Sequence, residues 1–442
     1  MTQTAKIISL GCAKNLCDSQ GIGGSLLASG WQLTDNTRRA DAVIINTCSF
    51  IQDARDESRQ TISRIISQSK SKQKNTQVVV AGCWAQDDPL KLKKEFPCVK
   101  AFVGTGNLAQ ISGILQGPGK SLVVKGKPGG WLTWEGRKNL RAAGASAYMR
   151  ISEGCSNGCS FCTIPRLRGK FTSREMKDIL MEAQVLDAAG IKEINLIGQD
   201  TTMYGSDLSG NNTLVSLLKK LLAYKSFAFI RILYAYPEHV RDSLLRLIAA
   251  ESSICKYLDM PLQHIATPIL KSMGREQSEA GIRKLIDKIF KYIPDVHLRS
   301  SFIVGFPGET ENDFSRLLAF ITEGHITHGG VFAYSREAHT RAYAMKQQIP
   351  EKIKQERKRI LLQAQQKAVK QKNKERIGKI IDVLLIYVDT AYGIGRSQWE
   401  APDVDGRILC SGSGLKNKKT GDIVRVRITD FYEYDCYGEI LS

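Results

Sequence analysis

The chain has 442 residues, of which 42% are hydrophobic, so it is long enough for two to four packed domains. It contains no run of about 18 apolar residues, so we expect no membrane span. We find no pattern of a secretory signal at its start, so its eleven cysteines do not indicate a disulfide framework. The net charge of +19 favours an acidic partner such as RNA or a ribonucleoprotein, although a solvated basic surface accounts for the charge equally well. We expect a cytoplasmic protein with no membrane segment, in which the clustered cysteines bind metal.

The first segment, residues 1–135, predicts an open parallel α/β sheet domain. Three apolar runs indicate buried strands, and helical patterns such as residues 54–69 lie between them. The runs are residues 7–10, 43–45 and 78–81. Each predicted strand leads into a cysteine: Cys12, Cys48 and Cys83. Because ligands bind beyond the carboxyl ends of parallel strands, we expect these three cysteines to converge on one metal site.

The second segment, residues 140–368, predicts a partial (β/α) barrel. It follows a Gly- and Lys-rich stretch, residues 117–139, which we interpret as a linker between domains. Six strand candidates alternate with helical patterns, and polar residues gather where the strands end, which is the face where such barrels hold their active sites. The helical patterns include residues 174–189, 213–223, 278–292 and 311–323.

The last segment, residues 377–442, predicts a small antiparallel β-barrel after a long basic helix at residues 351–376. Its runs are short and β-rich, with Gly and Asp at the turns. It carries eight Lys and Arg against ten Asp and Glu, a net charge of −2, whereas the whole chain is strongly basic. A domain that binds nucleic-acid phosphates is expected to be basic, so the net charge of −2 favours a protein partner.

The stretch CSNGCSFC places Cys155, Cys159 and Cys162 within eight residues, directly after a predicted strand. Zinc sites usually pair two C-x2-C knuckles, and no second knuckle accompanies this one. A cysteine nucleophile would not need two further thiols beside it. Three thiolates in one loop suit an iron–sulfur cubane that keeps one iron free of protein ligands.

This C-x3-C-x2-C motif after a first barrel strand resembles that of the radical S-adenosylmethionine superfamily. The resemblance implies that Cys155, Cys159 and Cys162 are catalytic and hold a [4Fe–4S] cluster. It also implies that S-adenosyl-L-methionine fills the open positions of the fourth iron, where electron transfer releases a 5′-deoxyadenosyl radical.

Further motifs resemble the methylthiotransferase branch of that superfamily. They are GCAKN, NTCSF, GCWAQ, LIGQDTTMYG, MPLQHIATPILKSMGR and FIVGFPGETENDF, and the last segment resembles the TRAM domain. The resemblance covers essentially the whole chain. It implies that Cys12, Cys48 and Cys83 hold a second, auxiliary [4Fe–4S] cluster whose open iron binds the sulfur to be transferred.

Three motifs resemble the protein-directed members of the branch: TTMYG, GRSQWEAPDVDG and YEYDCYGEIL. They imply a transferase that methylthiolates the β-carbon of an aspartate in uS12, the decoding-centre protein of the small ribosomal subunit. The slightly acidic last segment supports this independently, since ribosomal proteins are basic. Two alternatives stay open, a tRNA adenosine methylthiotransferase and a non-catalytic iron–sulfur or zinc protein that docks on ribosomes. We expect an external electron donor and a monomeric enzyme.

Further polar residues at predicted strand ends are candidates for binding S-adenosylmethionine. The resemblance suggests that Gln199 and Asp200 reach the ribose hydroxyls or the methionine amine. Gln263 and His264 end another strand, where His264 is as readily a structural hydrogen-bonding residue as a ligand contact. The turn that begins at Gly305 brings backbone toward the adenine or simply connects a strand to a helix.

Several positions depart from the family pattern without removing a predicted cluster ligand. Cys17 and Trp84 replace usual aliphatic residues, and we expect Cys17 to be a buried bystander rather than an alternative ligand. The pair Ala338-His339 stands in YSREAHT where the usual pattern is YS-x-E-x-GT. The isolated cysteines are expected to be packed inside the fold: Cys98, Cys255, Cys410 and Cys436.

Overall fold

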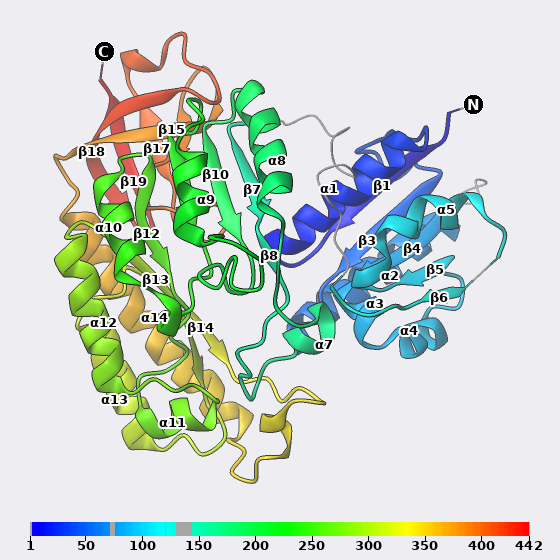
Figure 1. The fold of residues 1–442 in the computed structure, drawn as a ribbon, viewed down its shortest axis with the longest axis horizontal. Helices are drawn as coiled ribbons and strands as arrows, with labels where there is room; N and C mark the ends of the chain where they lie inside the picture. Colours follow the sequence, from blue (N-terminus) through cyan, green and yellow to red (C-terminus); the bar gives the residue numbers. More distant parts are fainter. Residues whose placement is uncertain (1, 71–75, 120, 130–143, 442) are drawn as a thin grey trace.

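The computed structural model describes residues 2–70, 76–119, 121–129 and 144–441, and its main sheets follow one another along the chain (Figure 1). The first is a six-stranded sheet in which all neighbouring strands are parallel. Its order is β2 (Gln32–Leu33), β1 (Thr4–Ser9), β3 (Ala42–Thr47), β4 (Gln77–Gly82), β5 (Ala101–Val103) and β6 (Leu122–Val124). The predicted open parallel sheet is therefore confirmed.

The helices of this first part cover both faces of its sheet, and each face has its own apolar core. All six residues of β3 are buried, as expected for a central parallel strand covered on both sides. The helices are α1 (Ala13–Ala28), α2 (Gln52–Lys70), α3 (Cys83–Asp87), α4 (Pro89–Glu95), the 3-10 helix η1 (Thr105–Gln110) and α5 (Ile111–Gln116).

The interpretation of residues 117–139 as a linker is wrong for part of its length. Leu122–Val124 form β6, which pairs with β5 and extends the first sheet by one strand. The run Leu122-Val123-Val124 is apolar enough to pair with an edge strand, even though Gly and Lys surround it. Residues 130–139 lie outside the described residues.

The second sheet confirms the predicted partial barrel, with six strands in the order β14-β13-β12-β11-β10-β7, all parallel to their neighbours. Its strands are β7 (Ser146–Arg150), β10 (Glu193–Ile197), β11 (Phe229–Ile232), β12 (Ile254–Asp259), β13 (His297–Val304) and β14 (His328–Ala333). The connecting helices are α8 (Met176–Ala188), α9 (Leu214–Leu221), α10 (Asp242–Ala250), α11 (Thr267–Ser272), α12 (Glu279–Tyr292) and α13 (Glu311–Thr322). They pack against the strands in one large apolar core.

After the long helix α14 (Glu351–Lys374), five strands close a barrel in the order β15-β16-β17-β19-β18. These strands are β15 (Ile380–Val388), β16 (Gly393–Arg396), β17 (Ile408–Ser411), β18 (Ile423–Tyr432) and β19 (Asp435–Ile440). The prediction of an antiparallel barrel is wrong at one seam, because β17 and β19 pair in parallel. Strand directions alternate at the other four seams, and a closed ring of five strands cannot alternate at every seam.

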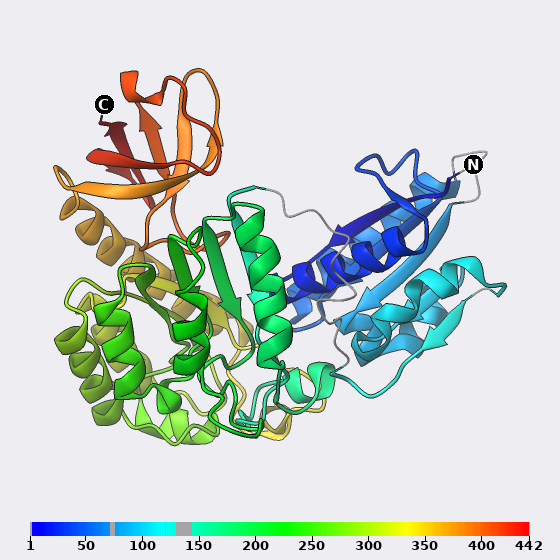
Figure 2. The ribbon, with the colours of Figure 1, turned by 45° about the horizontal axis from the view of Figure 1, so that its top comes forward.

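The first sheet and the C-terminal barrel contact different sides of the central part (Figure 2). Helix α1 packs along the edge strand β7, and α7 (Ile164–Arg168) packs against α3 and η1. On the other side, Arg231 of β11 is fully buried and donates to the carbonyls of Ser397 and Gln398, at 3.1 and 2.6 Å. Among the described residues, no helix has the length and apolar content needed to span a bilayer.

Candidate functional site

The three cysteines of the C-x3-C-x2-C motif lie in one loop at the carboxyl end of the central sheet. The loop follows β8 (Ser152–Glu153), which pairs with β9 (Thr172–Ser173) in a short antiparallel ladder that closes its base. The Cys155 amide donates to the carbonyl of Gly169 at 3.1 Å and narrows the loop further. We call this loop, residues 154–171, the motif loop.

The tip of the motif loop is fixed by hydrogen bonds from distant parts of the chain. The Ser160 amide donates to the carbonyl of Met273 at 2.8 Å, and its hydroxyl donates to the carbonyl of Ser272 at 2.8 Å. The Ser160 carbonyl accepts from the amide of Ala342, also at 2.8 Å. The cysteine spacing is therefore held both from within the loop and from the barrel around it.

Burial and nearby donor groups act in opposite directions on the thiolate forms of these cysteines. Burial raises the pKa of Cys162 to about 12 and also raises the pKa of Cys155. The Ile164 amide donates to the Cys162 sulfur at 3.4 Å, which is the type of contact that stabilises a ligating thiolate. Arg275, 5% exposed, adds positive charge near the loop, and its guanidinium lies 4.7 Å from the Tyr236 ring centroid. Arg275 ends the motif MPLQHIATPILKSMGR, but only the fold shows that it lies near the cysteines and against Tyr236.

The structure brings the three strand-end cysteines to one edge of the first sheet, since β1, β3 and β4 are neighbours in its order. Cys12 precedes helix α1, Cys48 lies in the loop after β3, and Cys83 begins α3 directly after β4. The electrostatic influence of Cys12 and Cys48 adds to burial, the largest cause, in raising the pKa of Cys83 to about 12. Helix α1 also directs its N-terminus toward this group, an arrangement that favours thiolates.

Two glycines allow the cysteine loops to approach one another. Gly11 has φ +88°, and a Cβ there would lie 2.7 Å from the Cβ of Cys48. Gly82 has φ +93°, and a Cβ there would lie 2.2 Å from Oδ1 of Asn46. Any larger residue would force the strand ends apart, which explains the Gly-Cys pairs at these two positions.

Asn15 connects all three of these loops. Its Nδ2 donates to the carbonyls of Leu10 and Thr47, at 2.8 and 3.1 Å, and these residues lie shortly before Cys12 and Cys48. Its Oδ1 lies 3.8 Å from the Cys83 sulfur and accepts from Nη2 of Arg168 at 2.5 Å. Asn15 stands in the GCAKN motif, but only the fold shows that it joins separate loops.

Arg168 belongs to the motif loop, so a buried charge network links the two groups of cysteines. Its Nη1 lies 2.6 Å from Oδ2 of Asp18 in α1 and 3.3 Å from Oε2 of Glu153. Nη1 of Arg150 pairs with the same two carboxylates, at 2.5 and 2.7 Å. The four side chains balance one another's charges and are at most 3% exposed, so they form a satisfied buried network rather than an isolated ion pair.

Within the described ranges, no three histidine, cysteine or carboxylate side chains are placed to hold a single metal ion. A zinc ion requires its ligands within about 2.3 Å of one point. In an iron–sulfur cubane each thiolate binds its own iron, so the sulfurs stand farther apart.

Gln199 and Asp200 lie at the carboxyl end of β10, beside the motif loop. Gln199 Nε2 donates to Oε1 of Glu153 at 2.5 Å, whereas its Oε1 is buried and has no partner in the described structure. Asp200 Oδ2 lies 2.9 Å from Nδ2 of Asn157 and 2.8 Å from Nδ1 of His239. Burial opposes ionisation of Asp200, but these hydrogen bonds outweigh it and hold its pKa below the usual value.

Two further candidates, Gln263 and His264, follow β12 at the carboxyl end of the central sheet, and Gly305 follows β13 at the same end. Gln263 has φ +71°, and its backbone bonds to Ser301 and Ile303 of β13. His264 is fully buried, and its Nε2 lies 3.6 Å from Oε1 of Glu309, with no hydrogen-bond partner for either atom in the described structure. A Cβ at Gly305 would lie 2.3 Å from Cγ of Lys354 in α14, so this turn approaches the helix closely.

The remaining cysteines divide by exposure. Cys17 is 1% exposed and lies 3.7 Å from the carbonyl of Tyr148, in agreement with the expectation that it is buried. Cys255, Cys410 and Cys436 are buried as expected. Cys98 is exposed, so the prediction that it packs inside the fold is wrong. It lies in the turn between α4 and β5, where the chain runs along the surface.

The departure at Ala338-His339 has a clear backbone consequence. His339 has φ +67°, the left-handed conformation that favours glycine, at the position where the family pattern has Gly. Nearby, Glu337 forms a 2.7 Å ion pair with Arg55 of α2. The loop therefore keeps its shape at a cost in backbone strain, and it contacts the first part of the chain.

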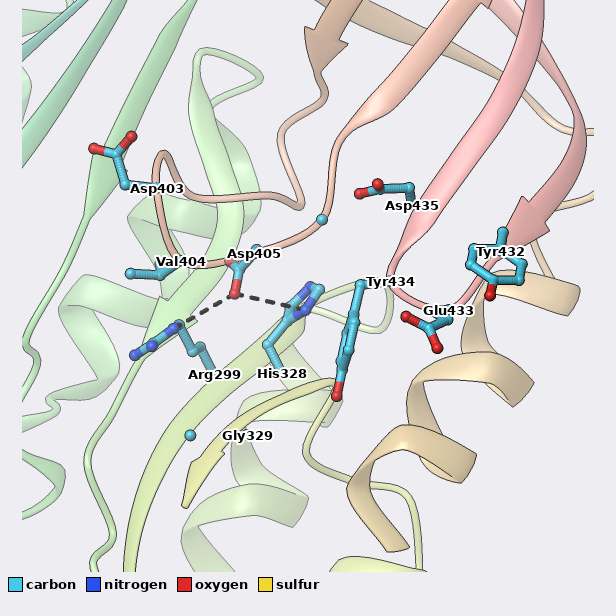
Figure 3. Close-up of a pocket in the computed structure, with 12 residues that line it drawn as sticks. Arg299, His328, Gly329, Asp403, Val404, Asp405, Tyr432, Glu433, Tyr434 and Asp435 are labelled. Carbon is cyan, nitrogen blue, oxygen red and sulfur yellow. Dashed lines mark ion pairs between the residues drawn. The ribbon is translucent and has the colours of Figure 1, made fainter. Parts of the chain in front are cut away.

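A separate pocket of about 490 Å³ lies between the central sheet and the C-terminal barrel (Figure 3). Across this pocket, Asp405 lies at ion-pair distance from Arg299 and His328, at 3.4 and 3.6 Å. Arg299 lies near the start of β13 and His328 begins β14, so the pocket lies at the opposite strand ends from the cysteines. Its charged groups join the two parts, and Arg299 also pairs with Asp259 at the end of β12, at 3.1 Å.

Comparison with family models divides the chain into three matched regions. Residues 4–104 match the uncharacterized protein family UPF0004, residues 149–321 the radical SAM superfamily, and residues 377–441 the TRAM domain. The cysteines at positions 12, 48 and 83 fall in the first region, and those of the motif loop fall in the second.

Full-length relatives match the whole chain. The chain is 42% identical to the ribosomal protein uS12 methylthiotransferase RimO of Elusimicrobium minutum, over 98% of this chain and 99% of the relative. It is also 42% identical to the protein of the same name from Geobacter sulfurreducens, over 100% and 99%. Among solved structures, the radical S-adenosylmethionine methyltransferase TsrM from Kitasatospora setae has a TM-score of 0.56 at 15% identity and 77% coverage of both chains, which shows a shared fold.

Proposed function

The chain belongs to the RimO family of ribosomal protein uS12 methylthiotransferases, and on this basis we propose that it attaches a methylthio group to the β-carbon of an aspartate in uS12. The observation that carries the proposal is identity of 42% across essentially the whole length of such relatives. The buried ion-pair network that joins the motif loop to helix α1 of the first part supports it.

The motif-loop cysteines are proposed to hold one [4Fe–4S] cluster, and Cys12, Cys48 and Cys83 a second. The radical SAM match supports the first cluster, and the placement of the other three cysteines after neighbouring strands of the first sheet supports the second. When bound, the clusters and S-adenosyl-L-methionine supply the one-electron chemistry that an unactivated C–H bond requires and the sulfur that is transferred.

The chain's own residues have two tasks in this proposal. Glu153 fixes the amide of Gln199, whose free Oε1 can then accept from the amine or ribose of S-adenosylmethionine. His264 Nε2 and Glu309 Oε1, which lie 3.6 Å apart without a hydrogen bond, are further polar atoms at the same strand ends. Meanwhile, Arg168 and Asp18 hold the first part of the chain against the motif loop, which sets the separation of the two cysteine groups.

The partner is proposed to be uS12, free or on the ribosome in the cytoplasm. We also propose an external electron donor and a monomeric enzyme. The C-terminal segment, with a net charge of −2, suits a basic ribosomal protein better than it suits RNA. The basic remainder of the chain is free to approach ribosomal RNA.

Mass spectrometry of uS12 and of total tRNA from a deletion strain tests the proposal. We expect uS12 to lose the mass of one methylthio group and tRNA to be unchanged. The modification should return with the wild-type gene but not with a Cys159→Ala variant. Loss of a methylthio group from tRNA alone would establish the tRNA-directed activity instead.

A further inference from the structure

Lys14 is a buried cation at the junction of the two cysteine groups. It lies in the first turn of α1, two residues after Cys12, and is 7% exposed. Its Nζ stands 3.1 Å from the centroid of the Tyr234 ring, which belongs to the loop after β11 of the central sheet. The side chain therefore reaches from the first sheet across to the barrel.

Within the described part of the chain, Lys14 has no carboxylate at ion-pair distance. Asp259 accepts from the Tyr234 amide at 3.1 Å, but it forms its own ion pair with Arg299, also at 3.1 Å. A buried ammonium without an anion is costly, and the hydrogen bond and cation–π contact with Tyr234 offset only part of that cost. The position is thus prepared for a negatively charged group that arrives with a ligand.

A continuous chain of contacts places Lys14 between the two proposed clusters. On one side it is two residues from the exposed Cys12. On the other side the Tyr234 carbonyl accepts from the Thr201 amide at 3.1 Å, and the adjacent Asp200 bonds to Asn157 in the motif loop at 2.9 Å. A group bound at Lys14 would face both cysteine trios.

We propose that Lys14 is a substrate-binding residue that forms an ion pair with the side-chain carboxylate of the target aspartate. The inference rests on the proposed function, because an aspartate is the substrate in that proposal. The carboxylate carbon is bonded directly to the β-carbon, so the ion pair would hold the reacting carbon between the clusters. It would also select aspartate over asparagine and over a neutral nucleobase.

A binding experiment that needs no turnover tests this role. Labelled uS12 and a uS12 variant with asparagine at the target position are titrated with cluster-loaded enzyme in the absence of reductant. We expect the wild-type enzyme to prefer the aspartate form by roughly 10- to 100-fold, the range of a charge-assisted hydrogen bond. Lys14→Met should lose this preference while it binds the asparagine form as well as the wild type does.

Two further variants control for charge and position. Lys14→Arg keeps the positive charge and should retain most of the preference. Lys6→Met removes a lysine of the same sheet, which pairs with the exposed Asp35 at 2.7 Å, and should leave the preference unchanged. Iron content, measured for each variant, shows that the clusters are loaded.

The main rival is that Lys14 neutralises the charge of the auxiliary cluster. In that case Lys14→Met would shift the midpoint potential of this cluster and leave the aspartate preference intact, which overturns the proposal. Equal binding of both uS12 forms by the wild type overturns it without any variant. Failure of the wild type to methylthiolate the aspartate form at all would instead refute the proposed function.

Discussion

The two cysteine trios are built in opposite ways. The motif loop carries Cys155, Cys159 and Cys162 within eight residues, and a short ladder closes it locally. The other trio comes from three separate strand ends, spread from position 12 to position 83, and meets only because β1, β3 and β4 are neighbours.

This contrast separates local from tertiary control of a metal site. The spacing within the motif loop survives small movements of the barrel, since its ligands share one short segment. The strand-end group depends on Asn15, which bonds to the two loops that precede Cys12 and Cys48, and on the glycines that allow the loops to approach. We therefore expect the strand-end site to be the more sensitive to changes in its surroundings.

We expect the largest effect when one cysteine of each trio is substituted, because the two trios are proposed to carry out different steps. Cys159→Ala should reduce both 5′-deoxyadenosine formation and methylthio transfer to background, because Cys159 is a proposed ligand of the cluster that we propose cleaves S-adenosylmethionine. Cys48→Ala should retain cleavage and lose only the methylthio product. Both outputs are measured by mass spectrometry in one anaerobic assay.

The exposed Cys98 supplies the control for that split, and Cys98→Ala should behave as the wild type does. Methylthiolated uS12 from the Cys48→Ala enzyme would show that the strand-end trio does not handle sulfur. Loss of cleavage in this variant would show instead that the two sites are not independent.

An effect of intermediate size should show how far each trio depends on hydrogen bonds from the residues around it. Asn15→Ala removes the donor to the carbonyls of Leu10 and Thr47 and an acceptor from Arg168, so we expect the cluster-free protein to lose about 2–3 kcal/mol in the free energy of unfolding. Reconstitution should then recover roughly half of the iron, since only the motif-loop cluster assembles fully. Urea unfolding and iron analysis measure the two quantities.

Asn157→Ala is the matched change in the motif loop. Asn157 donates to Asp200, which keeps its contacts with His239 and Thr202, so the loss should be about 1 kcal/mol and the iron content should stay near that of the wild type. Equal iron loss in the two variants would contradict the idea that the trios differ in their dependence on tertiary support.

The smallest expected effect concerns the loop around His339, which contacts the first part of the chain through the ion pair of Glu337 with Arg55. His339→Gly should stabilise the protein by about 0.5–1 kcal/mol, because relief of the left-handed strain exceeds the entropy that glycine adds to the unfolded chain. His339 is exposed, so little packing is lost. The adjacent Ala338→Gly, without a positive φ, should destabilise the protein in the same urea assay, and equal effects of both changes would contradict the strain argument.

Much of the fold followed from patterns that are local in the sequence. Buried apolar runs such as residues 43–45 and 78–81 predicted parallel strands, and the alternation with helices predicted the two α/β parts. The strand β6 was missed because three apolar residues inside a Gly- and Lys-rich stretch give too short a signal. The parallel seam between β17 and β19 was missed because pairing partners are a property of the closed barrel, not of any one strand.

The candidate site shows the same division. The sequence by itself predicted which cysteines group together, since the motif spacing and the positions after buried strands are local features that the chain carries before it folds. Only the tertiary structure decided what surrounds them: the network of Arg150, Glu153, Arg168 and Asp18, the Asn15 contacts, and the approach of Lys14 to Tyr234. Those contacts join residues separated by up to 220 positions, as between Lys14 and Tyr234, and no periodicity or spacing encodes which distant side chains a fold will bring face to face.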